Sequence, residues 1–267
     1  MKLNRRIAIA AAAIAMMAGA STAAMADIKF GVAAEPYAPY SSKDASGKWV
    51  GWEIDLMNAL CAQMNEKCEL VEVAWDGIIP ALTSKQIDVI FSSMSITDER
   101  KKTIDFSDMY YNTPSNLIGQ KDGDTDITPA HLKGKVLGVQ VSTTHERYAQ
   151  KYFGAAGAEV KTYSTQDEAN NDLAAGRLDY VQADSTALDA FLKSDQGKQC
   201  CELKGTVPED DAVLGFGVGA GVRQEDTALK EKINAAIAEL AKQKKFTEIT
   251  VNYPELQGIL VTPENKP

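Results

Sequence analysis

Residues 82–89 read LTSKQIDV and residues 173–180 read LAAGRLDY, so two distant parts of the chain carry nearly the same pattern. Each stretch predicts a helix end, a tight turn and a short buried strand. The first strand runs into Ser92 and Ser93, and the second ends close to Asp184. Ligands of open α/β sheets bind outside the carboxyl ends of the strands. The repeated pattern therefore predicts two α/β halves that hold a ligand between them.

Strand and helix patterns alternate along much of the remaining chain. Strands are expected at 28–32, 70–73, 87–91, 136–140, 159–163, 178–182 and 215–222, and helices at 52–64, 166–175, 185–193 and 227–245. Such alternation is typical of βαβ units. We therefore expect an α/β fold with two lobes, each a mostly parallel sheet flanked by helices. The last of these helices should pack on the outside of the first lobe.

The first 26 residues predict a cleaved export signal that is not part of the fold. Basic residues precede an apolar run at 7–20, and residues 24–26 (AMA) match the small-x-small pattern of a cleavage site. The apolar run is too short to span a membrane. Removal of this signal leaves enough chain for one large domain or two smaller ones.

The chain is acidic, with a formal net charge of −9 at pH 7. Loss of the basic export signal makes the remaining protein more negative still. The chain therefore lacks the basic footprint of a nucleic-acid-binding protein. The same charge argues against an anionic membrane surface as a partner.

The four cysteines permit three disulfide pairings. Export makes disulfides permissible. A bridge between Cys61 and Cys68 is favoured, because it would link a helix end to the next strand. Cys200 and Cys201 are adjacent and can pair only through a strained ring, so their state stays open.

The richest polar stretch, SSMSITDER at residues 92–100, suits the binding of a carboxylate. Thr97 or Asp98 is expected to cap a short helix whose first turn holds Arg100. Backbone N–H groups at the helix start and a guanidinium that grips both oxygens favour an anion. The alternative is ordinary capping, with Arg100 in a surface salt bridge.

Asp184 is the expected counterpart on the other half. A carboxylate in a cleft needs a cation, which a ligand ammonium would provide. The alternative is that Asp184 caps the helix at 185–193.

Aromatic and acidic side chains are candidates for the rest of a ligand site. Tyr37, Trp52 and Trp75 could line an apolar slot, although core packing is the ordinary role of an aromatic residue. Glu35 and Glu53 lie at positions that could reach the far end of a ligand, although single glutamates are usually solvated.

No nucleophile, base and acid set emerges from the sequence, which favours binding over catalysis. His145 follows the turn at 142–144 and is interpreted as a surface histidine at a helix start, not as a base. His131 and His145 do not lie at ligand spacing from the cysteines, so we expect no metal and no cofactor.

Four motifs together resemble one protein family: YAPY at 37–40, GWEIDL at 51–56, WDGIIP at 75–80, and SSMSIT at 92–97 followed by Arg100. On these motifs the chain closely resembles the periplasmic amino-acid-binding proteins of ABC importers, the family 3 solute-binding proteins. It is most similar to the lysine/arginine/ornithine-, histidine- and opine-binding group. The resemblance covers residues 27 to about 254, and the Cys61–Cys68 spacing fits the disulfide of that group.

The resemblance implies a periplasmic binding protein fold whose lobes are joined by two crossing strands that act as a hinge. Lobe 1 would be residues 27–112 and 216–267, and lobe 2 would be residues 113–215 with hinge segments at both ends. It also implies a monomer that closes on an amino acid or opine in the periplasm and is then recognised by the transporter permease in the inner membrane.

Site roles follow from the same resemblance. Arg100 would clamp the ligand α-carboxylate with Ser95 and the backbone at Thr144. Asp184 would take the α-ammonium with Ser93 nearby, and Tyr37 and Trp75 would sandwich the ligand side chain. The expected ligand-binding set is Tyr37, Glu53, Trp75, Ser92, Ser93, Ser95, Arg100, Thr143, Thr144, His145 and Asp184.

Departures from the family pattern leave the ligand open. Binders of cationic amino acids carry an acid where this chain has Ala34, Glu53 stands where several have Asp, and His145 stands where relatives often have Gln. A lysine, arginine or ornithine type of ligand is expected, with an opine or a neutral polar amino acid as alternatives. An exported enzyme on this scaffold, such as a cyclohexadienyl dehydratase, and a sensor module for a chemoreceptor are the alternative functions.

Overall fold

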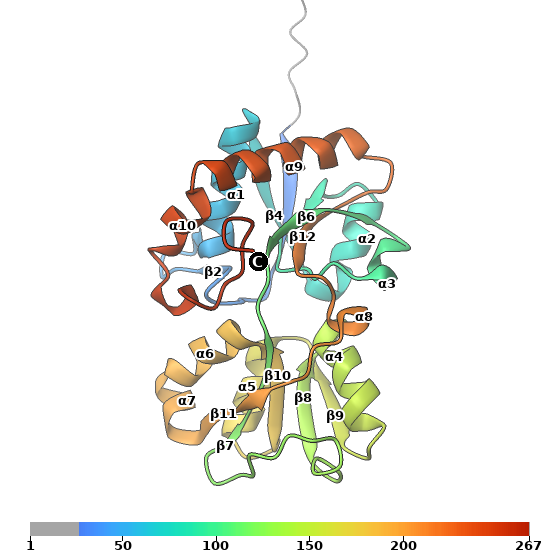
Figure 1. Ribbon diagram of the computed structural model, residues 1–267, viewed down its shortest axis with the longest axis vertical. Coiled ribbons are helices and arrows are strands. Elements are labelled where there is room, and N and C mark those ends of the chain that lie inside the picture. Colours follow the sequence, from blue (N-terminus) through green and yellow to red (C-terminus); the bar gives the residue numbers. More distant parts are fainter. Residues whose placement is uncertain (1–26, 267) are drawn as a thin grey trace, which may run out of the picture.

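The computed structural model describes residues 27–266 and shows two five-stranded sheets, each flanked by helices, one above the other in Figure 1. We call the sheet β4-β1-β5-β12-β6 with its helices the first lobe, and the sheet β11-β7-β10-β8-β9 with its helices the second lobe. The predicted α/β fold with two lobes is confirmed. The expected export signal at 1–26 lies outside the described residues.

The first lobe is built from both ends of the described chain. Its strands are β1 (Ile28–Ala33), β4 (Cys68–Val73), β5 (Val89–Ile90), β6 (Asp105–Tyr111) and β12 (Val218–Val222). Its helices are α1 (Trp52–Met64), α2 (Ile78–Thr83), α3 (Asp98–Lys101), α9 (Thr227–Lys242) and α10 (Lys245–Thr250). The hairpin β2 (Ser42–Lys43) and β3 (Trp49–Val50) and the 3₁₀ turns η1 (Trp75–Gly77) and η3 (Pro254–Leu256) complete it.

The second lobe comes from the middle of the chain. Its strands are β7 (Ser115–Gln120), β8 (Val136–Gln140), β9 (Glu159–Tyr163), β10 (Tyr180–Asp184) and β11 (Cys201–Thr206). Its helices are α4 (Thr144–Tyr148), η2 (Ala149–Gly154), α5 (Gln166–Ala174), α6 (Ser185–Lys193) and α7 (Asp195–Cys200). Helix α8 (Asp211–Leu214) lies on the return to the first lobe and contacts α4.

Each sheet is more mixed than the expected mostly parallel arrangement. β1 is parallel to β4 and β5, but β12 is antiparallel to β5 and β6. Likewise β8 is parallel to β9 and β10, but β7 is antiparallel to β10 and β11. β7 and β12 are the strands that enter one lobe from the other, so they run away from the gap between the lobes. The other strands end at that gap, where ligands of α/β sheets bind.

The repeated sequence pattern forms the same contacts in both lobes. The backbone N–H of Asp88 donates to the Lys29 carbonyl at 2.8 Å, and its carboxylate accepts from the Lys29 N–H at 3.1 Å. Asp179 makes the same pair of bonds with Val136, at 2.9 and 2.8 Å. Each aspartate therefore ties a helix-to-strand turn to the start of the neighbouring parallel strand.

The apolar residue before each aspartate packs over a glycine of that neighbouring strand. A Cβ on Gly31 would overlap the Ile87 side chain, and a Cβ on Gly138 would overlap Leu178. Close contact between the turn and the strand explains why both patterns carry Ile or Leu at this position.

The chain crosses between the lobes at residues 112–114 and 207–217. The C-terminal segment lies against the first crossing, because Asn112 and Val261 exchange two backbone hydrogen bonds of 2.8 and 3.0 Å. The C-terminal segment thus lies against one of the two crossings where a hinge was predicted, and hinge motion itself stays a prediction.

Helix α9 covers the first lobe and contacts α1 (Figure 1). Its inward face buries Ile233, Ala236, Ile237 and Leu240. The helix ends at Lys242 rather than Lys245, and Lys244 has a φ of 61° in the left-handed region. None of the helices within 27–266 is long and apolar enough to cross a membrane.

Two disulfides each lie within one lobe. The predicted Cys61–Cys68 bridge is present and joins the end of α1 to the start of β4, with Cα atoms 6.2 Å apart. Cys200 and Cys201, whose state the sequence left open, are bonded to each other where α7 meets β11.

Candidate ligand-binding site

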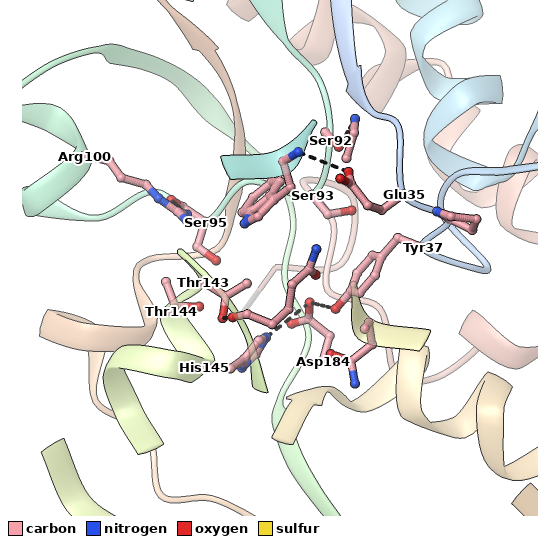
Figure 2. Close-up of a pocket in the computed structure, with 15 residues that line it drawn as sticks. Glu35, Tyr37, Ser92, Ser93, Ser95, Arg100, Thr143, Thr144, His145 and Asp184 are labelled. Carbon is pink, nitrogen blue, oxygen red and sulfur yellow. Dashed lines mark hydrogen bonds and ion pairs between the residues drawn. The ribbon is translucent and has the colours of Figure 1, made fainter. Parts of the chain in front are cut away.

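A cleft lies between the carboxyl ends of β1 and β5 in the first lobe and of β8 and β10 in the second (Figure 2). Polar and charged side chains from both lobes point into it. The residues from the predicted set that line it are Tyr37, Trp75, Ser92, Ser93, Ser95, Arg100, Thr143, Thr144, His145 and Asp184. The fold therefore brings together residues that lie up to 147 positions apart in the chain.

Arg100 is held at the start of the short helix α3. The Thr97 side chain caps this helix by accepting from the Arg100 backbone N–H at 3.2 Å, as predicted. The guanidinium donates to the Ser95 carbonyl at 2.9 Å and to the Ser142 carbonyl of the second lobe at 3.2 Å. Arg100 is only 6% exposed, and among residues 27–266 it has no carboxylate partner, so the surface salt bridge alternative is wrong.

The electrostatic surroundings of Arg100 favour an incoming anion. Burial, followed by the positive charge of Arg147, lowers the pKa of the Arg100 guanidinium to about 9. The group is still protonated at neutral pH, but it is a buried cation without a counter-ion. A ligand carboxylate would remove that electrostatic cost.

Trp75 lies against the Arg100 guanidinium, whose central carbon is 5.6 Å from the centre of the indole ring. The indole N–H of Trp75 is buried and has no hydrogen-bond partner in the described part of the chain. The cleft thus contains an unused donor next to its cation.

Asp184 is the last residue of β10 and receives donors from both lobes. Its carboxylate accepts from the Tyr37 hydroxyl at 2.6 Å and from the Thr113 hydroxyl at 3.3 Å, and His145 Nε2 lies 3.6 Å away. Burial raises the pKa of Asp184, but His145, Tyr37 and Thr113 outweigh it, so the pKa lies below its ordinary value. The Asp184 side chain makes no capping bond to α6, so the capping alternative is wrong.

His145 is buried, which corrects the expectation of a surface histidine. Its Nδ1 lies 3.0 Å from the Ser115 hydroxyl, and its Nε2 faces Asp184. The neighbouring Thr143 caps α4 by accepting from the Glu146 N–H at 3.1 Å. This cap places Thr144 and His145 in the first turn of α4, at the edge of the cleft.

Glu53 does not line the cleft, contrary to its place in the predicted set. It is fully buried behind Ser93, whose N–H and hydroxyl donate to its carboxylate at 2.7 and 3.0 Å, and Tyr110 donates to it as well. Ser93 has a φ of 53°, in the left-handed region. Glu53 therefore positions the serine loop from behind and cannot meet the far end of a ligand.

Trp52, considered above for an apolar slot, belongs to the core of the first lobe. It is 0% exposed and packs against Tyr40, Tyr111 and Phe246. Its indole N–H donates to Thr250 at 2.8 Å. Trp52 therefore packs in the core and does not contribute to a ligand slot.

Three polar residues of the cleft were missing from the predicted set. Glu35, weighed above only as one of two acids, lines the cleft and accepts from the Trp75 backbone N–H at 3.1 Å. Gln140 and Gln166 also line it. Gln140 could have been found, because it ends a predicted strand at the ligand edge of the sheet. Gln166 follows the cap residue Thr165 of a capping box with Glu168, a pattern that marks a helix start but not which of its side chains line a cleft.

The described residues contain no group of three or more His, Cys, Asp or Glu side chains that could hold a metal ion. What the cleft offers is a buried cation, an acid from the opposite lobe, hydroxyls and helix starts. This arrangement can hold a small zwitterion without any covalent step.

Comparison with known proteins gives a consistent result. The model of the bacterial extracellular solute-binding proteins, family 3, matches residues 28–255. The L-arginine-binding protein of Pseudomonas aeruginosa is 42% identical over 246 residues, which cover 92% of this chain and 94% of that protein. The lysine/arginine/ornithine-binding periplasmic protein of Escherichia coli is 39% identical over 248 residues, covering 90% and 95% of the two chains.

A solved structure of an ancestral arginine-binding protein bound to arginine is similar along most of the chain. Its TM-score is 0.78 at 34% sequence identity, and the match covers 85% of this chain and 97% of that one.

Proposed function

Because the chain belongs to the bacterial extracellular solute-binding proteins of family 3, we propose that it captures a cationic amino acid in the periplasm and delivers it to an ABC importer. The observation that carries this proposal is the pair of opposite charges on separate lobes, Arg100 and Asp184, facing one cleft. Only a closed cleft brings both into contact with one zwitterion. Closure of the lobes is then the signal that the membrane permease reads.

The α-carboxylate of the ligand would bind to Arg100. The Arg100 guanidinium now donates to two backbone carbonyls, and it has further N–H groups for the ligand. The unpartnered indole N–H of Trp75 lies on the ring that faces this guanidinium and would add a second donor to the carboxylate. The Ser95 side chain and the backbone at the start of α4 complete this end of the site.

The α-ammonium of the ligand would bind to Asp184. The hydroxyl of Tyr37 and the ring of His145 already hold this carboxylate in position, and both line the cleft. Charged hydrogen bonds contribute roughly 1.5–3 kcal/mol each, and micromolar affinity needs about −8 kcal/mol. Two such anchors and the burial of the side chain reach that scale if closure of the lobes costs little.

Glu35 supports a cationic side chain. Apart from Asp184 it is the only acid that lines the cleft within the described residues, and it comes from the loop that follows β1. The family position for this acid is Ala34, one residue earlier. In this chain the acid thus lies one residue further along the loop. The names of the relatives, which are binding proteins for arginine and for lysine/arginine/ornithine, also support a cationic ligand.

We propose a monomer without catalytic activity. The relatives reported above are named as binding proteins. The enzyme alternative, a cyclohexadienyl dehydratase, requires a placed general acid, whereas the acids of this cleft are held by Tyr37, Thr113 and Trp75 as hydrogen-bond acceptors. Incubation of the pure protein with prephenate or arogenate should give no product.

Calorimetry with a panel of amino acids tests the proposal. We expect micromolar or tighter binding of at least one cationic amino acid, and Arg100→Ala or Asp184→Ala should weaken it by at least about tenfold. Arg177→Ala is the matched control, because Arg177 is exposed, pairs with Asp172 and does not line the cleft. Unchanged affinity in both cleft variants would show that Arg100 and Asp184 do not bind the ligand.

A further inference from the structure

We infer that Glu35, Gln140 and Gln166 form an acceptor cluster that selects a guanidinium over a primary ammonium at the end of the ligand side chain. This inference rests on the proposed function and narrows its ligand class to amino acids with a guanidino group. The cluster draws on both lobes, because Glu35 follows β1 and the two glutamines lie at the end of β8 and the start of α5.

Gln140 presents its carbonyl oxygen to the cleft. It is 8% exposed, and its side-chain nitrogen donates to the Ser164 carbonyl at 3.1 Å. A backbone carbonyl can only accept, so this bond fixes which end of the amide is the nitrogen. The only side-chain hydrogen bond of Gln140 within 27–266 is the one from its nitrogen, so its oxygen is available to a donor in the cleft that it lines.

Gln166 also donates its side-chain nitrogen to a protein acceptor, here another side-chain amide. It is 5% exposed, and its side-chain nitrogen donates to Asn170 Oδ1 at 3.0 Å, one turn further along α5. Within the described residues this is the only side-chain hydrogen bond of Gln166, so its oxygen is likewise available to a donor in the cleft. Each of these two buried amides thus uses its nitrogen on a protein acceptor and keeps its oxygen for a donor in the cleft that it lines.

The loop that carries Glu35 faces the start of α5. Pro36 and Tyr37 line a groove together with Asp167 and Asn170, which flank or bond Gln166. One Glu35 oxygen accepts from the Trp75 backbone N–H, and Figure 2 shows the Glu35 side chain on the opposite side of the cleft from Arg100. The negative charge therefore lies at the end of the cleft away from the carboxylate anchor.

Acceptors on several sides suit a guanidinium better than an ammonium. A guanidinium is planar, carries N–H groups along its edges, and stacks on aromatic rings such as Tyr37 and Trp75. An ammonium places its donors around one nitrogen and is more strongly hydrated, so it would leave acceptors in the cluster without a donor. A neutral ureido group would also place an oxygen against an acceptor.

Isothermal calorimetry with arginine, lysine, ornithine, citrulline and glutamine tests the inference on the wild-type protein. We expect arginine to bind at least about tenfold more tightly than lysine and citrulline. If lysine, ornithine or citrulline binds as tightly as arginine, the inference is overturned while the proposed function stands. If no amino acid binds, the proposed function fails as well.

Two variants distinguish the contribution of the glutamine oxygens from that of the negative charge of Glu35. Gln140→Leu should weaken arginine binding about three- to tenfold and leave lysine binding within about twofold, which lowers the preference for arginine. Glu35→Gln keeps an acceptor for the Trp75 N–H but should weaken arginine and lysine together. Gln86→Leu is the control, because Gln86 is exposed on the first lobe. An unchanged ratio of arginine to lysine affinity in Gln140→Leu, with a wild-type melting temperature, would contradict the inference.

Discussion

The Tyr37 hydroxyl of the first lobe donates a 2.6 Å hydrogen bond to the Asp184 carboxylate of the second lobe. Burial, followed by the negative charge of Asp184, keeps the pKa of Tyr37 above its ordinary value, so the hydroxyl remains a donor at neutral pH. The proposed acceptor for the ligand ammonium is therefore also a direct link between the lobes. In the proposed function, ligand binding and lobe closure therefore share the Asp184 carboxylate.

Tyr37→Phe should weaken ligand binding about three- to tenfold, because the closed form loses a hydrogen bond to a charged group. Calorimetry with arginine measures the change. Tyr253→Phe is a matched control, since Tyr253 also donates to a carboxylate, that of Asp55 at 2.8 Å, but within the first lobe. Equal affinities for Tyr37→Phe and the wild type would show that this bond does not favour closure.

The depressed pKa of Asp184 predicts how stability responds to pH. A carboxyl group whose pKa is lower in the folded than in the unfolded protein stabilises the fold above its unfolded pKa, and this contribution is lost as the pH falls through the folded pKa. Asp184→Asn removes the titration. The melting temperatures of ligand-free wild type and Asp184→Asn should therefore differ most near neutral pH and converge below about pH 4. A gap that is constant or widens in acid would contradict the prediction.

Glu53→Gln should lower the melting temperature by about 2–8 °C, because Ser93 and Tyr110 together direct three donors at this buried carboxylate. Burial raises the pKa of Glu53, and the bonds from Tyr110 and Ser93 only partly oppose it. Differential scanning calorimetry measures the effect. Glu69→Gln, on an exposed residue of β4, is the control and should change little. If both variants melt like the wild type, Glu53 does not hold the serine loop.

Gly138→Ala should destabilise the second lobe by about 1–3 kcal/mol, because the added Cβ would overlap Leu178 and press on Tyr163. Chemical denaturation measures the free energy of unfolding. Gly77→Ala is the matched control, since a Cβ there has no neighbour within 4 Å. Loss of stability in the control alone would refute the close contact between turn and strand.

Much of the fold could be predicted because local signals and tertiary contacts agree. The patterns at 82–89 and 173–180 predicted a helix end, a tight turn and a short buried strand, and both lobes have all three. The helix at 52–64 and the strands at 136–140 and 159–163 have the predicted bounds. The mixed sheets were not predicted, because strand direction depends on where the chain changes lobes.

Site residues near the ends of strands could be predicted from the sequence. The direction in which a side chain points from a helix could not. Arg100 and Asp184 follow strands at the ligand edge, and the structure places both in the cleft. Periodicity assigns Glu53 to a helix start but cannot say that it faces Ser93 instead of the cleft. Trp52, by contrast, precedes Leu56 and Leu60 at helical spacing, a pattern that already favoured the core.

Neither disulfide connects the two lobes: Cys61–Cys68 stiffens one half of the molecule and Cys200–Cys201 the other. In the proposed periplasmic location, oxidation of the four cysteines would therefore stiffen each lobe without cross-linking one lobe to the other. The lobes would remain free to separate when a ligand enters or leaves.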